Sequence, residues 1–165
     1  MSSFLGKIIR WSLRRSPWIL HFNSGSCNAC DIEILDVLTP YHDAERLGVR
    51  LVATPRHADA ILLTGPITRE SLGKVVEAIL AVPEPKLVVA IGSCACGGGI
   101  WYDSFAVLGG LPELYRYMRE ELGVQPPPTI YVPGCPPRPE AILHAIALAQ
   151  GRAVKKVRRE VYVEG

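Results

Sequence analysis

Short apolar runs alternate with segments of helical hydrophobic spacing along most of the chain. Each run is bounded by glycine, proline or polar turn residues, as is typical of buried strands. The predicted strands cover residues 18–22, 49–53, 60–65, 86–92 and 129–134. The predicted helices cover residues 29–38, 70–82, 112–122 and 139–151. Strands that alternate with helices predict a doubly wound α/β domain, with a mostly parallel sheet and helices on both faces.

The two ends of the chain have a different pattern. Residues 4–15 place apolar side chains on one broad helical face and most of the basic ones on the opposite face, which predicts an amphipathic helix. We therefore divide the chain into an N-terminal helix (1–16), an α/β domain (17–151) and a basic C-terminal tail (152–165). The helix is expected to dock on its own domain or a neighbour, or to contact a membrane surface or membrane subunit. The tail is expected to be solvated charge or a docking segment.

Composition narrows the class of protein. The chain has 165 residues, a net charge of +2 and five cysteines. That charge is too small to indicate a nucleic-acid partner. No apolar segment approaches the roughly 20 residues that span a bilayer, and the N-terminus lacks the order of a secretory signal, so we expect an intracellular protein. An odd number of cysteines in that setting argues against a disulfide framework and favours metal binding or catalysis.

Four of the cysteines follow predicted strands. Cys27 and Cys30 follow the first strand, Cys94 follows the fourth and Cys135 follows the fifth. Because the carboxyl ends of parallel strands lie at one edge of the sheet, where such folds bind ligands, four sulfur atoms from three loops are expected to meet there.

Three kinds of site are compatible with these cysteines. A thioredoxin-like redox pair would explain the CxxC spacing but would leave Cys94 and Cys135 without a role. Structural zinc accepts four thiolates but usually uses two close-spaced pairs. A four-iron cluster suits one close pair and two distant single cysteines, and the glycines of GSCACGGG and VPGCPP let the backbone approach a bulky ligand. We favour the cluster. Cys96 lies two residues from Cys94, and spacing does not decide which of the two ligates.

Several segments resemble a known family: SCNACDIEI, YHDAERLGVRLVATPRHADAILLTGP, IGSCACGGG and YVPGCPPRPEA. Over roughly Arg15 to Ala149 the chain resembles the small subunit of membrane-bound, energy-converting (group 4) nickel–iron hydrogenases, including the formate hydrogenlyase type. That subunit is homologous to the cluster-bearing 20 kDa subunit of respiratory complex I. The resemblance implies a flavodoxin-like domain that carries one 4Fe-4S cluster.

The resemblance also assigns ligands. By position in the motifs they are Cys27, Cys30, Cys94 and Cys135, because the family cysteine follows Gly-Ser, as Cys94 does. Cys96 is then a departure without an assigned role. Complex I subunits tend to have two adjacent cysteines at the first position, so the spaced pair favours the hydrogenase branch.

Partners follow from the same resemblance. The chain is expected to be an electron-relay subunit of an oxidoreductase, between a ferredoxin-like two-cluster subunit and a nickel–iron-type large subunit. A membrane subunit is expected to bind the N-terminal helix, at the cytoplasmic face of the cell membrane. The alternatives are the equivalent subunit of a complex I-like quinone or sulfur-compound reductase, and a zinc-stabilised scaffold.

A few polar residues in these motifs are weaker candidates. Glu33, Arg56 and His57 are candidates to tune the cluster or to contact the large subunit, against the alternative of ordinary solvated or turn residues. Asp31 is interpreted as a charge in the first turn of a helix. His21 is interpreted as a core or interface residue. The long excursion that includes residues 111–128 predicts a site or a partner contact.

Overall fold

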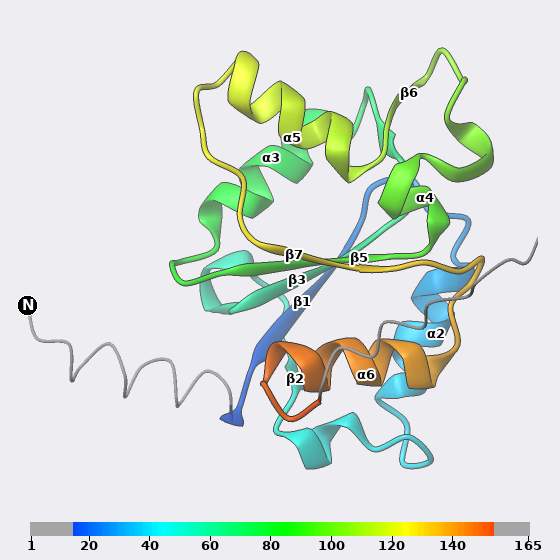
Figure 1. Ribbon diagram of the computed structural model, residues 1–165. Helices are drawn as coiled ribbons and strands as arrows, with labels where there is room; N and C mark the ends of the chain where they lie inside the picture. Colours follow the sequence, from blue (N-terminus) through cyan, green and yellow to red (C-terminus); the bar gives the residue numbers. More distant parts are fainter. Residues whose placement is uncertain (1–14, 154–165) are drawn as a thin grey trace, which may run out of the picture.

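Five parallel strands form the central sheet of the structure, a computed structural model that describes residues 15–153. The strands are β1 (Trp18–Asn23), β2 (Arg50–Leu51), β3 (Ala60–Thr64), β5 (Leu87–Ile91) and β7 (Thr129–Val132). They lie in the order β2-β1-β3-β5-β7 (Figure 1). This is the flavodoxin-like order, in which the direction of winding reverses between β1 and β3.

Helices cover both faces of the sheet, as the sequence predicts. α3 (Leu72–Ala81) and α5 (Leu111–Glu120) lie on one face, and α2 (Ala29–Val37) and α6 (Pro139–Ala149) lie on the other (Figure 1). The short helix α4 (Ser93–Gly97) directly follows β5. The predicted N-terminal amphipathic helix and the basic tail fall almost entirely in residues 1–14 and 154–165, outside the described residues.

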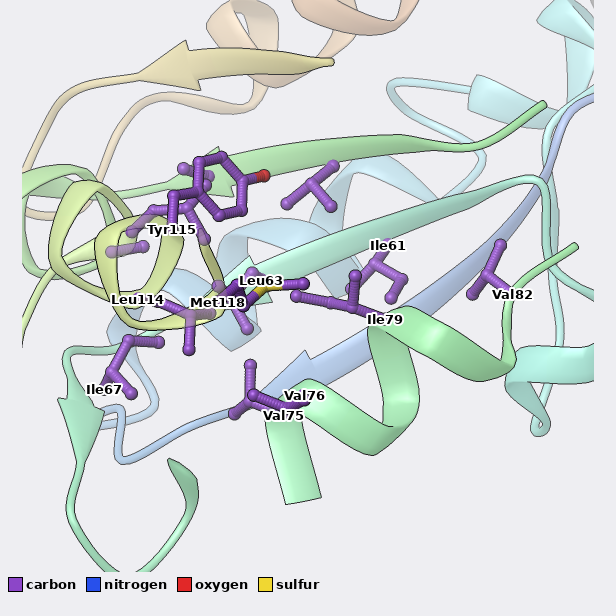
Figure 2. Close-up of a cluster of buried hydrophobic side chains, with 14 of the residues drawn as sticks. Ile61, Leu63, Ile67, Val75, Val76, Ile79, Val82, Leu114, Tyr115 and Met118 are labelled. Atoms are coloured by element: carbon purple, nitrogen blue, oxygen red, sulfur yellow. The ribbon is translucent and has the colours of Figure 1, made fainter. Parts of the chain in front are cut away.

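Alternating side chains of β3 join the sheet to the helices on its two faces. Ile61 and Leu63 belong to the core under α3 and α5 (Figure 2), whereas Ala60 and Leu62 belong to the core under α2 and α6. All five residues of β3 are buried. Since a fully buried large apolar side chain contributes about 1.5–3 kcal/mol, this strand is a major source of stability for both cores.

Some short elements were not predicted. β4 (Ile67–Thr68) and β6 (Val107–Gly109) form a separate antiparallel pair. Residues 15–153 also form three short 3₁₀ helices: η1 (Ala44–Leu47), η2 (Pro55–His57) and η3 (Gly99–Trp101). Elements of two to four residues are too short to show a hydrophobic period, which is why the sequence pattern missed them.

The excursion at 111–128 has a structural role. Its helix α5 places Leu111, Leu114 and Met118 at 0% exposure in the core. The Glu113 carboxylate accepts a hydrogen bond from the backbone N–H of Gly110 at 2.9 Å, which caps the start of the helix. The segment therefore completes one face of the domain. In the part of the chain that the structure describes, no helix is long and apolar enough to cross a membrane.

Candidate metal centre

Four thiols lie at the carboxyl edge of the sheet. Cys27 lies in the loop after β1, and Cys30 is in the first turn of α2. Cys94 is in α4, directly after β5, and Cys135 is in the loop between β7 and α6. The loop that carries the first two thiols emerges at the reversal point between β1 and β3, where flavodoxin-like folds bind their ligands.

The thiols are close enough to influence one another electrostatically. Cys30 is 8% exposed, and its burial, followed by the negative charges of its neighbours, raises the pKa of its thiol to about 11. The neighbours are, in order of effect, Cys27, Cys94, Asp31 and Cys135. Burial, then the charges of Cys135 and Cys27, also raises the pKa of the Cys94 thiol. The four sulfur atoms therefore form one group.

Two glycines leave room for the sulfur atoms. A Cβ on Gly92, whose φ is +91°, would lie 2.4 Å from the Sγ of Cys30. A Cβ on Gly99, whose φ is +55°, would lie 2.9 Å from the Sγ of Cys94. Both distances are shorter than van der Waals contact, so only glycine fits at these positions without displacing a thiol.

Hydrogen bonds connect two of the cysteine-bearing loops. The backbone N–H and the hydroxyl of Ser93 both donate to the carbonyl of Gly134, at 2.7 and 3.1 Å. Ser93 precedes Cys94 and Gly134 precedes Cys135, so this pair of bonds holds the two thiols in a defined relation.

Cys96 points away from this group. Its Sγ donates to the carbonyl of Ala90 at 3.6 Å, and its side chain packs against the core under α3 and α5. Burial raises the pKa of its thiol. The charge of Cys94 contributes to the raised pKa of Cys96, but the charge of Cys96 does not contribute to the raised pKa of Cys30.

A buried polar cluster supports the loop that carries Cys27 and Cys30. Asp31 is 9% exposed and accepts hydrogen bonds from the side chains of His21, Thr64 and Asn23. The sequence pattern did not predict this role for any of them. The available signal was the polar residues at the carboxyl ends of two otherwise apolar strands, β1 and β3.

The weaker candidates separate into two places. Glu33 is half-buried on α2, one turn after Cys30. Arg56 and His57 are exposed in η2, which precedes β3 and so lies at the amino edge of the sheet. The structure therefore leaves Glu33 near the thiols and places Arg56 and His57 at the opposite edge.

Exposed apolar side chains lie beside the thiols. Four of them follow α4: Ile100, Trp101, Tyr102 and Phe105, with exposed fractions of 82%, 48%, 62% and 90%. The backbone at the end of this segment is anchored, because Arg69 donates to the Phe105 carbonyl through Nε at 2.7 Å and to the Ala106 carbonyl through its backbone N–H at 2.9 Å. We call residues 100–105 the aromatic loop.

The chemistry of the donor set fits a cluster of several metal ions. Negative charge on one of these sulfur atoms opposes deprotonation of the others, and a nearby metal cation such as iron would stabilise the thiolate forms. Within residues 15–153 no three His, Cys, Asp or Glu side chains are placed to hold a single metal ion. In a four-iron cluster each thiolate binds its own iron, so the sulfur atoms surround the cluster instead of one ion.

Comparison with known proteins identifies the family. Residues 27–149 match the family described as NADH ubiquinone oxidoreductase, 20 Kd subunit. The match covers most of the chain and contains all four thiols. The chain belongs to this family.

Relatives within the 20 Kd subunit family come from several complexes. The chain is 49% identical to "Probable membrane-bound hydrogenase subunit mbhJ" of Pyrococcus furiosus, over 89% of this chain and 81% of the relative. It is 37% identical to formate hydrogenlyase subunit 7 of Escherichia coli, over 88% of this chain but only 52% of that protein. It is 34% identical to a subunit of the NADH-quinone oxidoreductase of Geotalea daltonii, over 94% and 83% of the two chains. All three relatives are subunits of oxidoreductase complexes.

Solved structures agree with the fold of the 20 Kd subunit family. A chain of the archaeal membrane-bound sulfane sulfur reductase is 31% identical, with a TM-score of 0.70 over 87% of this chain and 73% of that chain. A chain of an NAD⁺-reducing nickel–iron hydrogenase has a TM-score of 0.60 at 18% identity, over 84% and 94%. The second likeness shows the fold alone.

Proposed function

We propose that this chain is the electron-relay subunit of a membrane-bound nickel–iron hydrogenase complex. It would hold one 4Fe-4S cluster and pass electrons between a ferredoxin-like two-cluster subunit and the catalytic large subunit. The observation that carries the proposal is the convergence of four thiols from three loops at the ligand-binding edge of the sheet. The hydrogenase subunit of P. furiosus, at 49% identity, supports the choice of complex.

Cys27, Cys30, Cys94 and Cys135 would hold the cluster, and the cluster would supply one-electron transfer. Cys30 is buried while Cys27 and Cys135 are exposed, so one side of the site is closed by the protein and the other side faces outward. A cluster held in this way is shielded from water on the sheet side and is accessible to a partner on the other. Glu33 remains a candidate to contact the cluster or the large subunit, and the proposal assigns no part in the site to Arg56 or His57.

The aromatic loop is the surface we assign to the large subunit. Phe105 is 90% exposed on a backbone that Arg69 fixes, and large aromatic side chains on rigid backbone are typical anchors of interfaces. The loop follows directly from α4, so a partner that covers it also covers Cys94. Such contact would bring the large subunit's redox centre within reach of the cluster.

The membrane attachment belongs to the N-terminal segment in this proposal. Residues 1–14, outside the described residues, would bind a membrane subunit and place the chain at the cytoplasmic face of the cell membrane. Deletion of residues 1–14 should release the chain from the membrane fraction while its iron content is unchanged. Unchanged membrane association would remove this part of the proposal.

Metal analysis tests the cluster. The chain, produced and purified without oxygen, should contain iron and acid-labile sulfide in equal amounts and should show the electron paramagnetic resonance signal of a reduced 4Fe-4S cluster. Serine at Cys27, Cys30, Cys94 or Cys135 should abolish or alter that signal. Cys96→Ser is the matched control, because Cys96 lies next to the site but faces the core, and it should keep the signal. Colourless protein with one zinc per chain would instead support the zinc-stabilised scaffold.

A second candidate function is the same relay in a sulfur- or quinone-reducing complex. The chain of the sulfane sulfur reductase, at 31% identity and a TM-score of 0.70, favours it. The intact complex separates the two functions. Hydrogen evolution from a reduced low-potential donor supports the hydrogenase, whereas reduction of a sulfur compound or a quinone without hydrogen evolution supports the alternative.

A further inference from the structure

The start of helix α2 is fastened to the sheet through a buried carboxylate. Oδ1 of Asp31 accepts hydrogen bonds from His21 Nε2 at 2.7 Å and from Thr64 Oγ1, and Oδ2 accepts from Asn23 Nδ2 at 2.8 Å. His21 and Asn23 belong to β1 and Thr64 belongs to β3. The carboxylate therefore connects the residue after Cys30 to both strands that flank the reversal point.

Asn23 extends this connection to the other thiol of the pair. Its Oδ1 accepts hydrogen bonds from the backbone N–H of Gly25 at 2.9 Å and of Ser26 at 2.8 Å. Both of these residues lie directly before Cys27. One side-chain amide thus joins the Asp31 carboxylate to the backbone of the loop, and each end of that amide has a partner.

Asp31 lies in the first turn of α2, where a negative charge is favourable, and its three hydrogen bonds offset part of the cost of burying it. Burying a carboxylate has a large cost in desolvation, and apolar replacements of buried charged groups are often neutral or stabilising. The geometry that connects this carboxylate to two strands and, through Asn23, to the loop before Cys27 favours a role in the site.

We propose that Asp31 is a positioning residue for the cluster site, which holds the Cys27–Cys30 loop through Asn23 and lowers the reduction potential of the cluster by its negative charge. This inference depends on the proposed function. A fixed negative charge beside a cluster makes the addition of an electron less favourable, because reduction adds a further negative charge to the same region. Hydrogen bonds from three donors hold the carboxylate beside the site.

Exchanging the two polar residues separates position from charge. Asp31→Asn removes the charge and leaves one acceptor oxygen where there were two, so the side chain can no longer accept from Asn23 on one side and from His21 and Thr64 on the other at the same time. In the double variant Asn23→Asp/Asp31→Asn, the amide at position 31 can donate to the carboxylate at position 23, whose other oxygen still accepts from Gly25 and Ser26. The double variant therefore restores the hydrogen bond between positions 23 and 31, keeps those from Gly25 and Ser26, and moves the negative charge from position 31 to position 23.

The experiment uses the purified complex, with iron content, potentiometric titration of the cluster signal, and thermal unfolding as readouts. In Asp31→Asn, the affinity for iron in competition with a chelator should fall by about 10- to 100-fold, the range typical when a group that orients a metal ligand is removed. The midpoint potential of the remaining cluster should shift to more positive values. The double variant should regain most of its iron retention. Glu77→Gln removes one charge from an exposed position on α3 and should match wild type in both readouts.

Some results would overturn the inference. Wild-type potential and iron retention in Asp31→Asn would exclude the assigned role, as would a lowered melting temperature with no change of potential, which is the signature of a structural residue. If Asp31→Asn does not fold, the double variant provides the test. A double variant that has the wild-type melting temperature but does not retain iron would also exclude the role. Absence of a cluster from the wild-type chain would defeat the proposed function itself, so the two failures are distinguishable.

Discussion

At the carboxyl edge of the sheet the strands end in polar residues and glycine-rich loops, whereas at the amino edge they begin among prolines and large apolar side chains. The carboxyl edge carries the four thiols, the Asp31 cluster and the aromatic loop. The amino edge has a cavity of about 370 Å³ lined mainly by apolar residues, among them Pro17, Ile19 and Leu62. None of the cysteines in residues 15–153 lines that cavity.

The difference follows from the direction of the strands. In a parallel sheet each helix begins near the carboxyl edge, so free backbone N–H groups and the loops that present them collect there. The amino edge receives the ends of the helices and closes the core. Binding and stability are therefore separated along the strands, and substitutions at the two edges should affect different measurements.

The largest effect is expected from a substitution at Gly92, whose backbone lies close to the Cys30 thiol at the carboxyl edge. In Gly92→Ala the new Cβ would lie 2.4 Å from Cys30 Sγ, at a φ of +91° that alanine adopts only with strain. The thiol has to move, so the iron content of the chain should fall to a small fraction of the wild-type value. Gly73→Ala is the control, because a Cβ there meets nothing within 4 Å. It should keep the iron and should raise stability by less than the roughly 0.5–1 kcal/mol expected in the middle of a helix, because Gly73 lies in the first turn of α3. Normal iron in Gly92→Ala would contradict the assigned geometry.

The second largest effect is a loss of stability in the apolar core, which lies between the two edges of the sheet. Leu63 is 0% exposed in β3, and Leu63→Ala should lower the free energy of unfolding by about 2–5 kcal/mol, the cost of a core cavity. Denaturant unfolding of the metal-free chain measures it. Leu80, which is 46% exposed, provides the control, and Leu80→Ala should change stability by less than about 0.5 kcal/mol. Equal effects for the two variants would contradict the description of the core.

Much of the layered fold could be predicted from the sequence because its core elements carry strong apolar patterns. β3 and β5 are continuous apolar runs, and α3 has regular helical spacing. The parallel sheet then places the cysteines after its strands at one edge. α4 was not predicted, because a five-residue helix with the sequence SCACG has no periodic signal and ends in glycine.

The finer geometry of the site depends on packing that a linear pattern does not contain. Cys94 and Cys96 are equivalent by spacing, and only the orientation of α4 turns Cys96 towards the Ala90 carbonyl. The hydrogen bond between Thr64 and Asp31 joins residues 33 positions apart. Arg56 and His57 lie in a segment that carries no cysteine, and η2, which holds them, precedes β3 and so lies at the amino edge.

A moderate effect is expected on assembly. Phe105→Ala removes an exposed aromatic side chain from the carboxyl edge and should weaken the affinity for the large subunit. The expected loss is about 1–2 kcal/mol, which corresponds to a factor of about 5–30 in the dissociation constant. The iron content should not change, because the Phe105 side chain is 90% exposed and so supports little of the buried structure around the thiols. Tyr41 is a matched aromatic residue at 88% exposure, beyond the carboxyl end of α2 and so towards the amino edge. Tyr41→Ala should leave assembly unchanged, and the reverse result would move the partner surface to the amino edge.

The smallest effect concerns a carboxylate at the amino edge. Burial raises the pKa of Asp59 above its usual 3.8, although the hydrogen bond from the backbone N–H of Trp18 opposes the shift. The folded state therefore favours the protonated acid, and that contribution to stability is lost as the pH rises through the folded-state pKa. Asp59→Asn keeps an acceptor for Trp18 without the charge, so at pH 7 it should raise the melting temperature, by about 2 °C or less. The gain should disappear below about pH 3.8, where Asp59 is protonated in both states. Asp103→Asn, an exposed carboxyl at the other edge, should give no such pH-dependent gain, and a lower melting temperature for Asp59→Asn at pH 7 would show that the charge of Asp59 stabilises the amino edge.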